Sequence, residues 1–162
     1  MACRSRQVLA VLLVLLVSSG AARADDELAH FNYAMNCQGC HLPDASGATD
    51  RVPNMNNFIG YFLRSAEGRA FVVHVPGVAA APLPDDQLAD LLNWMLLTYS
   101  PDQLPDNYKP YTTAEVASLR TEIESDPART RIAILHDIAQ TTPSLAHELA
   151  NAPESAPGHN DH

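Results

Sequence analysis

Apolar side chains recur at helical spacing most clearly over residues 85–98. The positions that follow the i, i+3, i+4, i+7, i+8 rule are Leu88, Leu91, Leu92, Met95 and Leu96. This spacing is typical of one face of an amphipathic helix. The pattern therefore predicts a helix over residues 85–98 that buries this face.

A second helical pattern begins at Asp25 or Asp26, either of which can cap a helix at its start. Leu28, Phe31 and Met35 then fall on one stripe. We expect this stripe, Met35 included, to join the hydrophobic core.

The middle of the chain is divided by turn residues. Residues 43–50 contain proline, glycine and aspartate and predict a loop. Residues 53–63 begin with Pro53, which suits the first position of a helix, and predict a second helix. Residues 67–75 are ambiguous, helical by context and strand-like by two adjacent valines, and end at Pro76.

The chain continues well past residue 100. Residues 101–111 are rich in proline and aspartate and predict a connector that wraps back over the core. Thr112 and Glu115 then fit a capping box. The stripe expected on that helix is Val116, Leu119 and Ile123.

A further helix is predicted over residues 127–139, because Pro127 suits a helix start. Its expected inward side chains are Ile132, Leu135 and Ile138. Residues 142–162 are biased to proline, alanine and serine, and we expect them to be a disordered tail. The sequence as a whole predicts an all-α fold.

The first 24 residues have the three parts of a secretory signal. A basic start with Arg4 and Arg6 is followed by the apolar run 8–17 and the small-x-small end 22–24. An uncleaved anchor is the alternative, but ten apolar residues fall short of the ~20 that a membrane span needs. We expect cleavage after Ala24, release into the periplasm, and no stable membrane insertion afterwards.

These patterns divide the chain into a signal peptide (1–24), a first domain (25–100), a helical extension (101–141) and a tail (142–162). The whole sequence has 162 residues, 10 basic and 19 acidic, for a net charge of −9. Cleavage removes three arginines and leaves 7 basic against 19 acidic residues, a net charge of −12. Such a chain is a poor partner for nucleic acid or an anionic membrane, because phosphate binding needs clustered lysine and arginine.

Two cysteines remain after signal cleavage, because Cys3 leaves with the signal. Cys37 and Cys40 form Cys-x-x-Cys, which by itself fits a disulfide, a redox dithiol or half of a zinc site. No second cysteine pair is present to complete a four-sulfur zinc site, and no βαβ pattern surrounds the motif. His41 follows directly, and Cys-x-x-Cys-His after a secretion signal indicates covalent attachment of one haem c.

The spacing has a physical basis. Residues three apart lie on one face of a helical turn, so Cys37 and Cys40 can reach the two vinyl groups on one edge of a porphyrin. His41 is then expected to be the proximal ligand of the iron.

On these residues the chain resembles a class I c-type cytochrome over roughly residues 25–100. The resemblance rests on the motif at residues 37–41, on the proline-containing segment 52–55, and on Val75-Pro76-Gly77, which is similar to the family's segment before the distal ligand. The family is small and all-helical, and its N-terminal and C-terminal helices cross beside the haem.

The resemblance implies two further roles. The Pro53 carbonyl would accept a hydrogen bond from the His41 ring, orienting the imidazole and raising its basicity. Trp94 resembles the family's aromatic residue at the helix crossing.

The chain departs from the family at the distal ligand. The family usually places a methionine shortly after the Pro-Gly turn, whereas residues 78–82 contain only valine, alanine and proline. His74 and Met55 are the candidate distal ligands. A histidine at a helix end is more often solvated than bound to iron, and the thioether of Met55 suits core packing. An open distal face is a third possibility.

These expectations describe a periplasmic carrier of single electrons rather than an enzyme. A periplasmic dehydrogenase would be its donor, and a cytochrome or terminal oxidase its acceptor. Two alternatives stay open: a haem-based module that binds or senses small ligands, and a fixed haem subunit of a larger redox complex. Peroxidase-like activity is the weaker expectation, because the apolar lining shows no arginine and acid pair for peroxide cleavage.

Overall fold

The computed structural model describes residues 25–47 and 52–150. Helices and loops make up this part of the chain, and it contains no strand. The all-α prediction is therefore confirmed. None of the helices described is long and apolar enough to cross a membrane. The signal at residues 1–24 and the tail at 151–162 lie outside the described residues.

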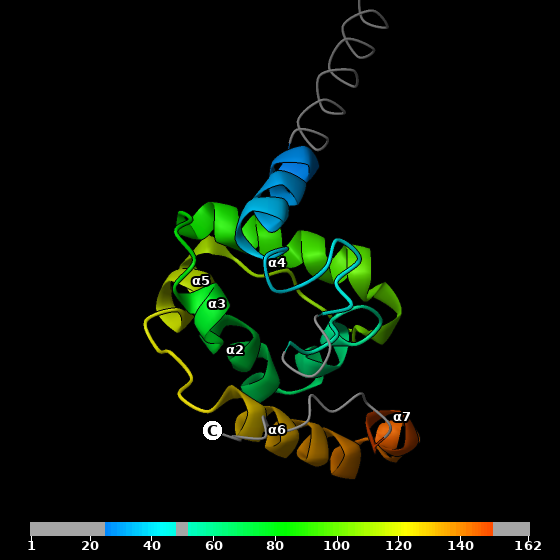
Figure 1. The fold of residues 1–162 in the computed structure, drawn as a ribbon. Helices are drawn as coiled ribbons and strands as arrows, with labels where there is room; N and C mark the ends of the chain where they lie inside the picture. Colours follow the sequence, from blue (N-terminus) through cyan, green and yellow to red (C-terminus); the bar gives the residue numbers. More distant parts are fainter. Residues whose placement is uncertain (1–24, 48–51, 151–162) are drawn as a thin grey trace, which may run out of the picture.

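The described part of the chain starts in a helix, of which residues 25–36 are described and which we call the first helix. The elements after it are η1 (Ile59–Arg64), α2 (Ala66–His74), α3 (Pro76–Ala79), α4 (Asp85–Tyr99), η2 (Pro101–Gln103), α5 (Thr113–Leu119), α6 (Pro127–Thr141), η3 (Pro143–Leu145) and α7 (Ala146–Ala150). Figure 1 shows the first helix crossing α4, and α6 on the opposite side of the molecule beyond α2.

The crossing of the first helix and α4 is built from aromatic rings. The ring of Trp94 lies 5.5 Å from that of His30 and 5.7 Å from that of Tyr33, and Tyr33 lies 5.2 Å from Tyr99. Tyr33 is fully buried and donates its hydroxyl to the carbonyl of Leu42 at 2.7 Å. Buried aromatic pairs at these distances stabilise a contact beyond the area that they bury. They therefore fix the end of the first helix, from which residues 37–41 continue.

The apolar stripe expected on the first helix does not face the core. Leu28, Phe31 and Met35 are exposed, and Met35 is 67% exposed. The buried side chains are instead Ala29 and Tyr33, with Asn32 beside them. The expected orientation is wrong because the small Ala29 and the ring of Tyr33 form the contact with α4, which turns the opposite face outward.

The helix predicted from Pro53 begins later, as the 3₁₀ helix η1 at Ile59. Hydrogen bonds to more distant backbone explain the delay. The Met55 amide donates to the Ala45 carbonyl at 2.8 Å, and the Asn57 amide donates to the Tyr99 carbonyl at 2.6 Å. Asn57 also has a φ of 54°, which a right-handed helix does not allow.

The ambiguous segment is helical, since α2 covers residues 66–74. Its start is capped by Ser65, whose hydroxyl accepts from the Gly68 amide at 2.9 Å. The helix predicted over residues 85–98 is α4, and all five predicted side chains are buried.

The connector after α4 wraps over the core as predicted. Tyr111 is buried, and its backbone amide and carbonyl both form hydrogen bonds with the side chain of Asn93. The Asn93 amide nitrogen donates to the Tyr111 carbonyl at 2.9 Å, and its oxygen accepts from the Tyr111 amide at 2.7 Å. The cap at Thr112 is confirmed, because its hydroxyl accepts from the Glu115 amide at 3.2 Å.

The last helices differ from expectation in detail. In α6 the buried apolar residues are Ile134, Leu135 and Ile138, whereas Ile132 is 51% exposed. Ile123 is exposed as well, because α5 ends at Leu119.

Disorder was expected from residue 142, and this is wrong for residues 143–150. They form η3 and α7. Leu149 is buried, and Glu148 accepts a hydrogen bond from the Tyr61 hydroxyl of η1. One apolar side chain and one long-range hydrogen bond thus order a segment whose local composition favours disorder.

Candidate functional site

The motif at residues 37–41 continues the first helix as a single turn. The Cys37 amide donates to the Tyr33 carbonyl at 2.9 Å. The amides of Cys40 and His41 then donate to the Cys37 carbonyl at 3.1 and 2.8 Å. This turn places the two cysteines and the histidine on one short stretch of backbone that follows the helix crossing.

The two thiols differ in environment. Cys37 is half-buried, Cys40 is exposed, and neither forms a disulfide. Burial, and secondarily the neighbouring Cys40, raise the pKa of the Cys37 thiol to about 11. A thiol with so high a pKa is protonated near neutral pH, and because the thiolate is the reactive form, we expect its oxidation and alkylation to be slow.

The imidazole of His41 is held in its neutral form. Burial lowers the pKa of His41, and the backbone carbonyl of Pro53 opposes this by favouring a protonated ring nitrogen. The Nδ1 atom is buried and has no hydrogen-bond partner of ordinary geometry in the described structure. Neutral imidazole is the form that binds metals, so a half-buried histidine with a lowered pKa directly after two cysteines fits a haem c.

A tight loop brings the Pro53 carbonyl to this position. Gly47 has a φ of 76°, and a Cβ atom built on it would lie 2.7 Å from the Pro53 oxygen. Ala45, also at positive φ (62°) and fully buried, accepts the Met55 amide through its carbonyl. Only glycine allows so close an approach of the two backbones. The sequence marked Gly47 as a loop residue, whereas nothing in it signalled Ala45.

The two candidate distal ligands lie in different surroundings. Met55 is partly buried and packs against the core. His74 ends α2, and its carbonyl accepts the Glu124 amide at 2.8 Å. The backbone of His74 is thus joined to the linker between α5 and α6.

The loop that follows α3 offers no ligand of its own. Residues 80–84, which we call the α3–α4 loop, are alanine, proline and leucine. Among residues 25–47 and 52–150, no cluster of three or more histidine, cysteine, aspartate or glutamate side chains could by itself hold a metal ion.

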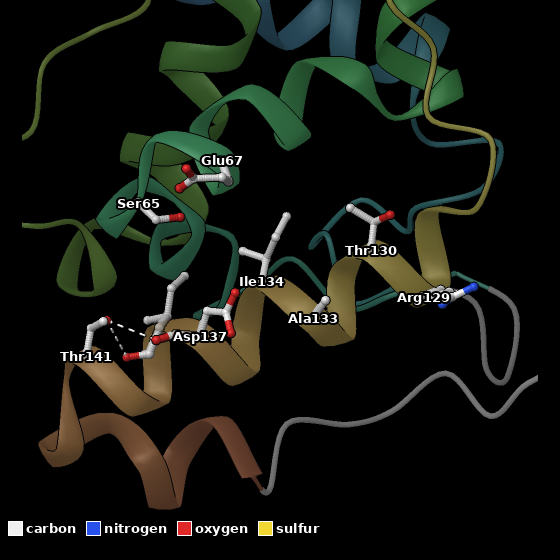
Figure 2. Close-up of a pocket in the computed structure, with 9 residues that line it drawn as sticks. Ser65, Glu67, Arg129, Thr130, Ala133, Ile134, Asp137 and Thr141 are labelled. Carbon is white, nitrogen blue, oxygen red and sulfur yellow. Dashed lines mark hydrogen bonds between the residues drawn. The ribbon is translucent and has the colours of Figure 1, made fainter.

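A cavity of about 330 Å³ lies between α6 and the start of α2 (Figure 2). Its lining residues are Ser65, Glu67, Arg129, Thr130, Ala133, Ile134, Asp137, Ile138 and Thr141. None of them belongs to the motif at residues 37–41, so this cavity is separate from the candidate site.

Several arginine side chains donate hydrogen bonds to backbone carbonyls of this protein. Arg64 donates to the carbonyls of Gln103 and Leu104, and Arg69 donates to those of Lys109 and Pro110. Because these arginines form contacts within the protein and acidic residues outnumber basic ones, we expect the surface charge to be mainly negative.

No protein-family model, curated protein or solved structure matches this chain.

Proposed function

We propose that this protein is a periplasmic monohaem c-type cytochrome that carries single electrons between redox proteins. The observation that supports this best is the motif itself. Cys37, Cys40 and His41 share one helical turn, and the half-buried imidazole of His41, whose pKa is lowered by burial, lies near the Pro53 carbonyl.

Each residue has a defined part in this proposal. Cys37 and Cys40 hold the cofactor through two thioether bonds, and His41 binds the iron through one ring nitrogen. The Pro53 carbonyl, held by its close approach to Gly47, would orient the His41 ring by accepting a hydrogen bond from it. Haem, when bound, supplies an iron that exchanges one electron between its ferric and ferrous states.

The acidic surface suits a partner with a basic docking patch. Opposite charges speed the encounter of two proteins, and salt screens that attraction over about 10 Å at 0.1 M ionic strength. Electron transfer to such a partner should therefore slow as the salt concentration rises. Rates that do not change with salt would refute electrostatic docking.

Haem attachment is tested by expressing the full chain in a bacterium that makes c-type cytochromes. Denatured protein from the periplasm should retain haem, seen as an increase in mass and as an alkaline pyridine spectrum. The variant lacking both Cys37 and Cys40 should carry none, whereas Cys3→Ala, the matched control, should load normally. Unmodified wild-type protein in the periplasm would overturn the proposal.

His41 is tested by its spectrum. His41→Ala leaves both thioether bonds possible but removes the proximal ligand, so the visible spectrum of the loaded protein should change. An unchanged low-spin spectrum would show that His41 does not bind the iron.

A second candidate function is the binding of a small ligand at an open distal face. It is favoured by the α3–α4 loop, which has no side chain able to bind iron. Carbon monoxide added to the reduced protein separates the two functions. A low-spin spectrum indifferent to carbon monoxide supports the electron carrier, and His74→Ala and Met55→Ala would then identify its sixth ligand. A high-spin spectrum that shifts supports ligand binding.

A further inference from the structure

The cavity between α6 and the start of α2 has a mixed lining (Figure 2). Its apolar side chains are Ala133, Ile134 and Ile138, and the two isoleucines are buried. Its polar side chains are Ser65, Glu67, Arg129, Thr130, Asp137 and Thr141. Its volume of about 330 Å³ is at the small end of the range found for ligand-binding pockets. The cavity therefore suits a small ligand that has both an apolar and a polar part.

The charges of the lining are separated along α6. Arg129 lies near the start of this helix, and Asp137 follows eight residues later, about 12 Å along the helix axis. Figure 2 shows Glu67, in the first turn of α2, toward the same end of α6 as Asp137, and Arg129 at the other end. Among the described residues that line the cavity, Arg129 is the only basic one. The Asp137 end is therefore negatively charged.

The two carboxylates have little to neutralise them. Within the part of the chain that the structure describes, the carboxylate of Glu67 forms no hydrogen bond or ion pair. Asp137, whose side chain is 82% exposed, lies 3.5 Å from the Nδ1 atom of the exposed His136, which is long for a hydrogen bond. The last turn of α6, which ends at Thr141, contains no basic residue, although the end of a helix favours a cation. This end of the cavity lacks a positive partner.

The hydroxyl groups in the lining add acceptors rather than donors. The Ser65 hydroxyl accepts from the Gly68 amide at 2.9 Å. The Thr141 hydroxyl donates its hydrogen to the carbonyls of Asp137 and Ile138, at 3.0 and 3.1 Å, so toward a ligand it can only accept. A ligand at this end must therefore bring both the donors and the positive charge. It must also bring an apolar body to cover the isoleucines, and an alkyl chain with a terminal ammonium group has both parts.

We propose that this cavity binds a primary ammonium group carried on an unbranched alkyl chain. The ammonium group lies between Glu67 and Asp137, and the alkyl chain lies over Ala133 and Ile134. Two sources supply this chemistry: a free diamine or polyamine, and a lysine side chain of a partner protein. The inference goes beyond the proposed function and does not depend on haem, because no residue of the motif at 37–41 lines the cavity.

The first experiment titrates the purified mature protein, labelled with ¹⁵N, with 1,5-diaminopentane and follows the amide chemical shifts. We expect shifts that saturate and that are centred on residues 65–67 and 133–141. In the same experiment pentylamine should bind about tenfold more tightly than methylamine, because each methylene that leaves water adds affinity. Equal binding of these two amines, or shifts that are scattered over the acidic surface without saturation, would overturn the proposal.

Charge variants distinguish a local site from the general attraction of a cation to an acidic protein. The double variant Glu67→Gln, Asp137→Asn should weaken the binding of 1,5-diaminopentane by about tenfold, since two ion pairs are lost. The matched control is Asp102→Asn, Glu122→Gln, which changes the net charge equally at exposed residues outside the lining and should change binding by less than about twofold. An equal loss in the two double variants would contradict a site in this cavity.

A filled cavity gives an independent check that leaves the charges in place. Ala133→Leu adds a larger side chain inside the lining and should abolish the saturating shifts. Ala128→Leu makes the same substitution at an exposed position of α6 outside the lining and should leave binding unchanged. Unchanged binding in Ala133→Leu would overturn the proposal. If Ala133→Leu does not fold, the charge variants, which keep the size of each side chain, decide the question.

The two sources are separated by comparing 1,5-diaminopentane with Nα-acetyl-lysine N-methylamide, which presents a lysine side chain without free backbone charges. Tighter binding of the diamine identifies a free diamine or polyamine as the ligand. Binding of the capped lysine that is at least as tight identifies a lysine of a partner protein. A wild-type chain that takes up no haem would refute the proposed function, whereas these titrations would still test the cavity.

Discussion

Arg69 joins the core to the C-terminal extension, and replacing it should destabilise the protein measurably. Its guanidinium forms a two-point contact with Glu115, with Nε 2.5 Å from Oε1 and Nη2 2.8 Å from Oε2. It also donates to the carbonyls of Lys109 and Pro110 at 2.8 and 3.2 Å. The same group lies 4.1 Å from the centre of the Tyr111 ring.

The magnitude follows from these contacts and their exposure. Hydrogen bonds to charged groups contribute about 1.5–3 kcal/mol each when well buried. The side chains of Arg69 and Glu115 are 21% and 30% exposed, so solvent weakens their attraction. The cation over Tyr111 contributes about 0.5–1 kcal/mol. Arg69→Met keeps the aliphatic stem and should lower the free energy of unfolding by about 2–3 kcal/mol.

The assay is guanidinium unfolding of the mature chain at neutral pH, with Glu115→Gln and the double variant completing a cycle. We expect a coupling energy near 1 kcal/mol between Arg69 and Glu115. Arg129→Met, at an exposed arginine of α6, is the control and should stay within about 0.5 kcal/mol of wild type.

The pH dependence gives an independent check. The hydrogen bond from Arg69 lowers the pKa of Glu115 below its ordinary value of 4.5. Its contribution is therefore complete above pH 4.5 and is lost as the pH falls through the lowered pKa. The difference between wild type and Arg69→Met should shrink as the pH falls below 4.5. A loss below about 0.5 kcal/mol at neutral pH, or a coupling energy of zero, would refute the role given to Arg69.

Three further predictions concern the candidate site. Gly47→Ala should destabilise the protein by about 1–3 kcal/mol in chemical unfolding, because φ is positive there and the added Cβ would meet the Pro53 oxygen. Gly39→Ala is the control and should destabilise the protein far less, because a Cβ at Gly39 meets nothing within 4 Å. In the haem-free chain, alkylation of Cys37 followed by mass spectrometry should be slow at neutral pH and accelerate toward pH 11; fast labelling at neutral pH would contradict its burial. Because burial lowers the pKa of His41, its contribution to haem-free stability is complete above pH 6.5 and falls as the pH drops toward the folded-state value, and His41→Gln should remove this slope.

Most of the helices could be predicted from local patterns. The spacing of the leucines fixes α4, Thr112 caps α5, and Pro127 begins α6. The Cys-x-x-Cys-His motif is equally local, because five consecutive residues carry the chemistry and one helical turn sets their spacing. Such features depend on neighbours within a few positions, which the sequence shows directly.

The direction of each helix face could not be predicted so well. Leu28, Phe31 and Met35 form a correct helical stripe, yet they point outward because Ala29 and Tyr33 make the contact with α4. In α6 the inward face is shifted, so Ile132 is exposed. Periodicity identifies a face, but the partner helix decides which face is buried.

Local sequence thus determined the all-α fold, the boundaries of α4 and α6 to within two residues, and the residues of the candidate site. Tertiary structure alone decided the roles of the arginines, because Arg69 and Arg120 bind residues 35 to 46 positions away in the chain. It also decided that Gly47 lies against Pro53, and that α7 is ordered through Tyr61. Contacts of this kind leave no periodic trace in the sequence, since each joins segments that meet only when the whole core has formed.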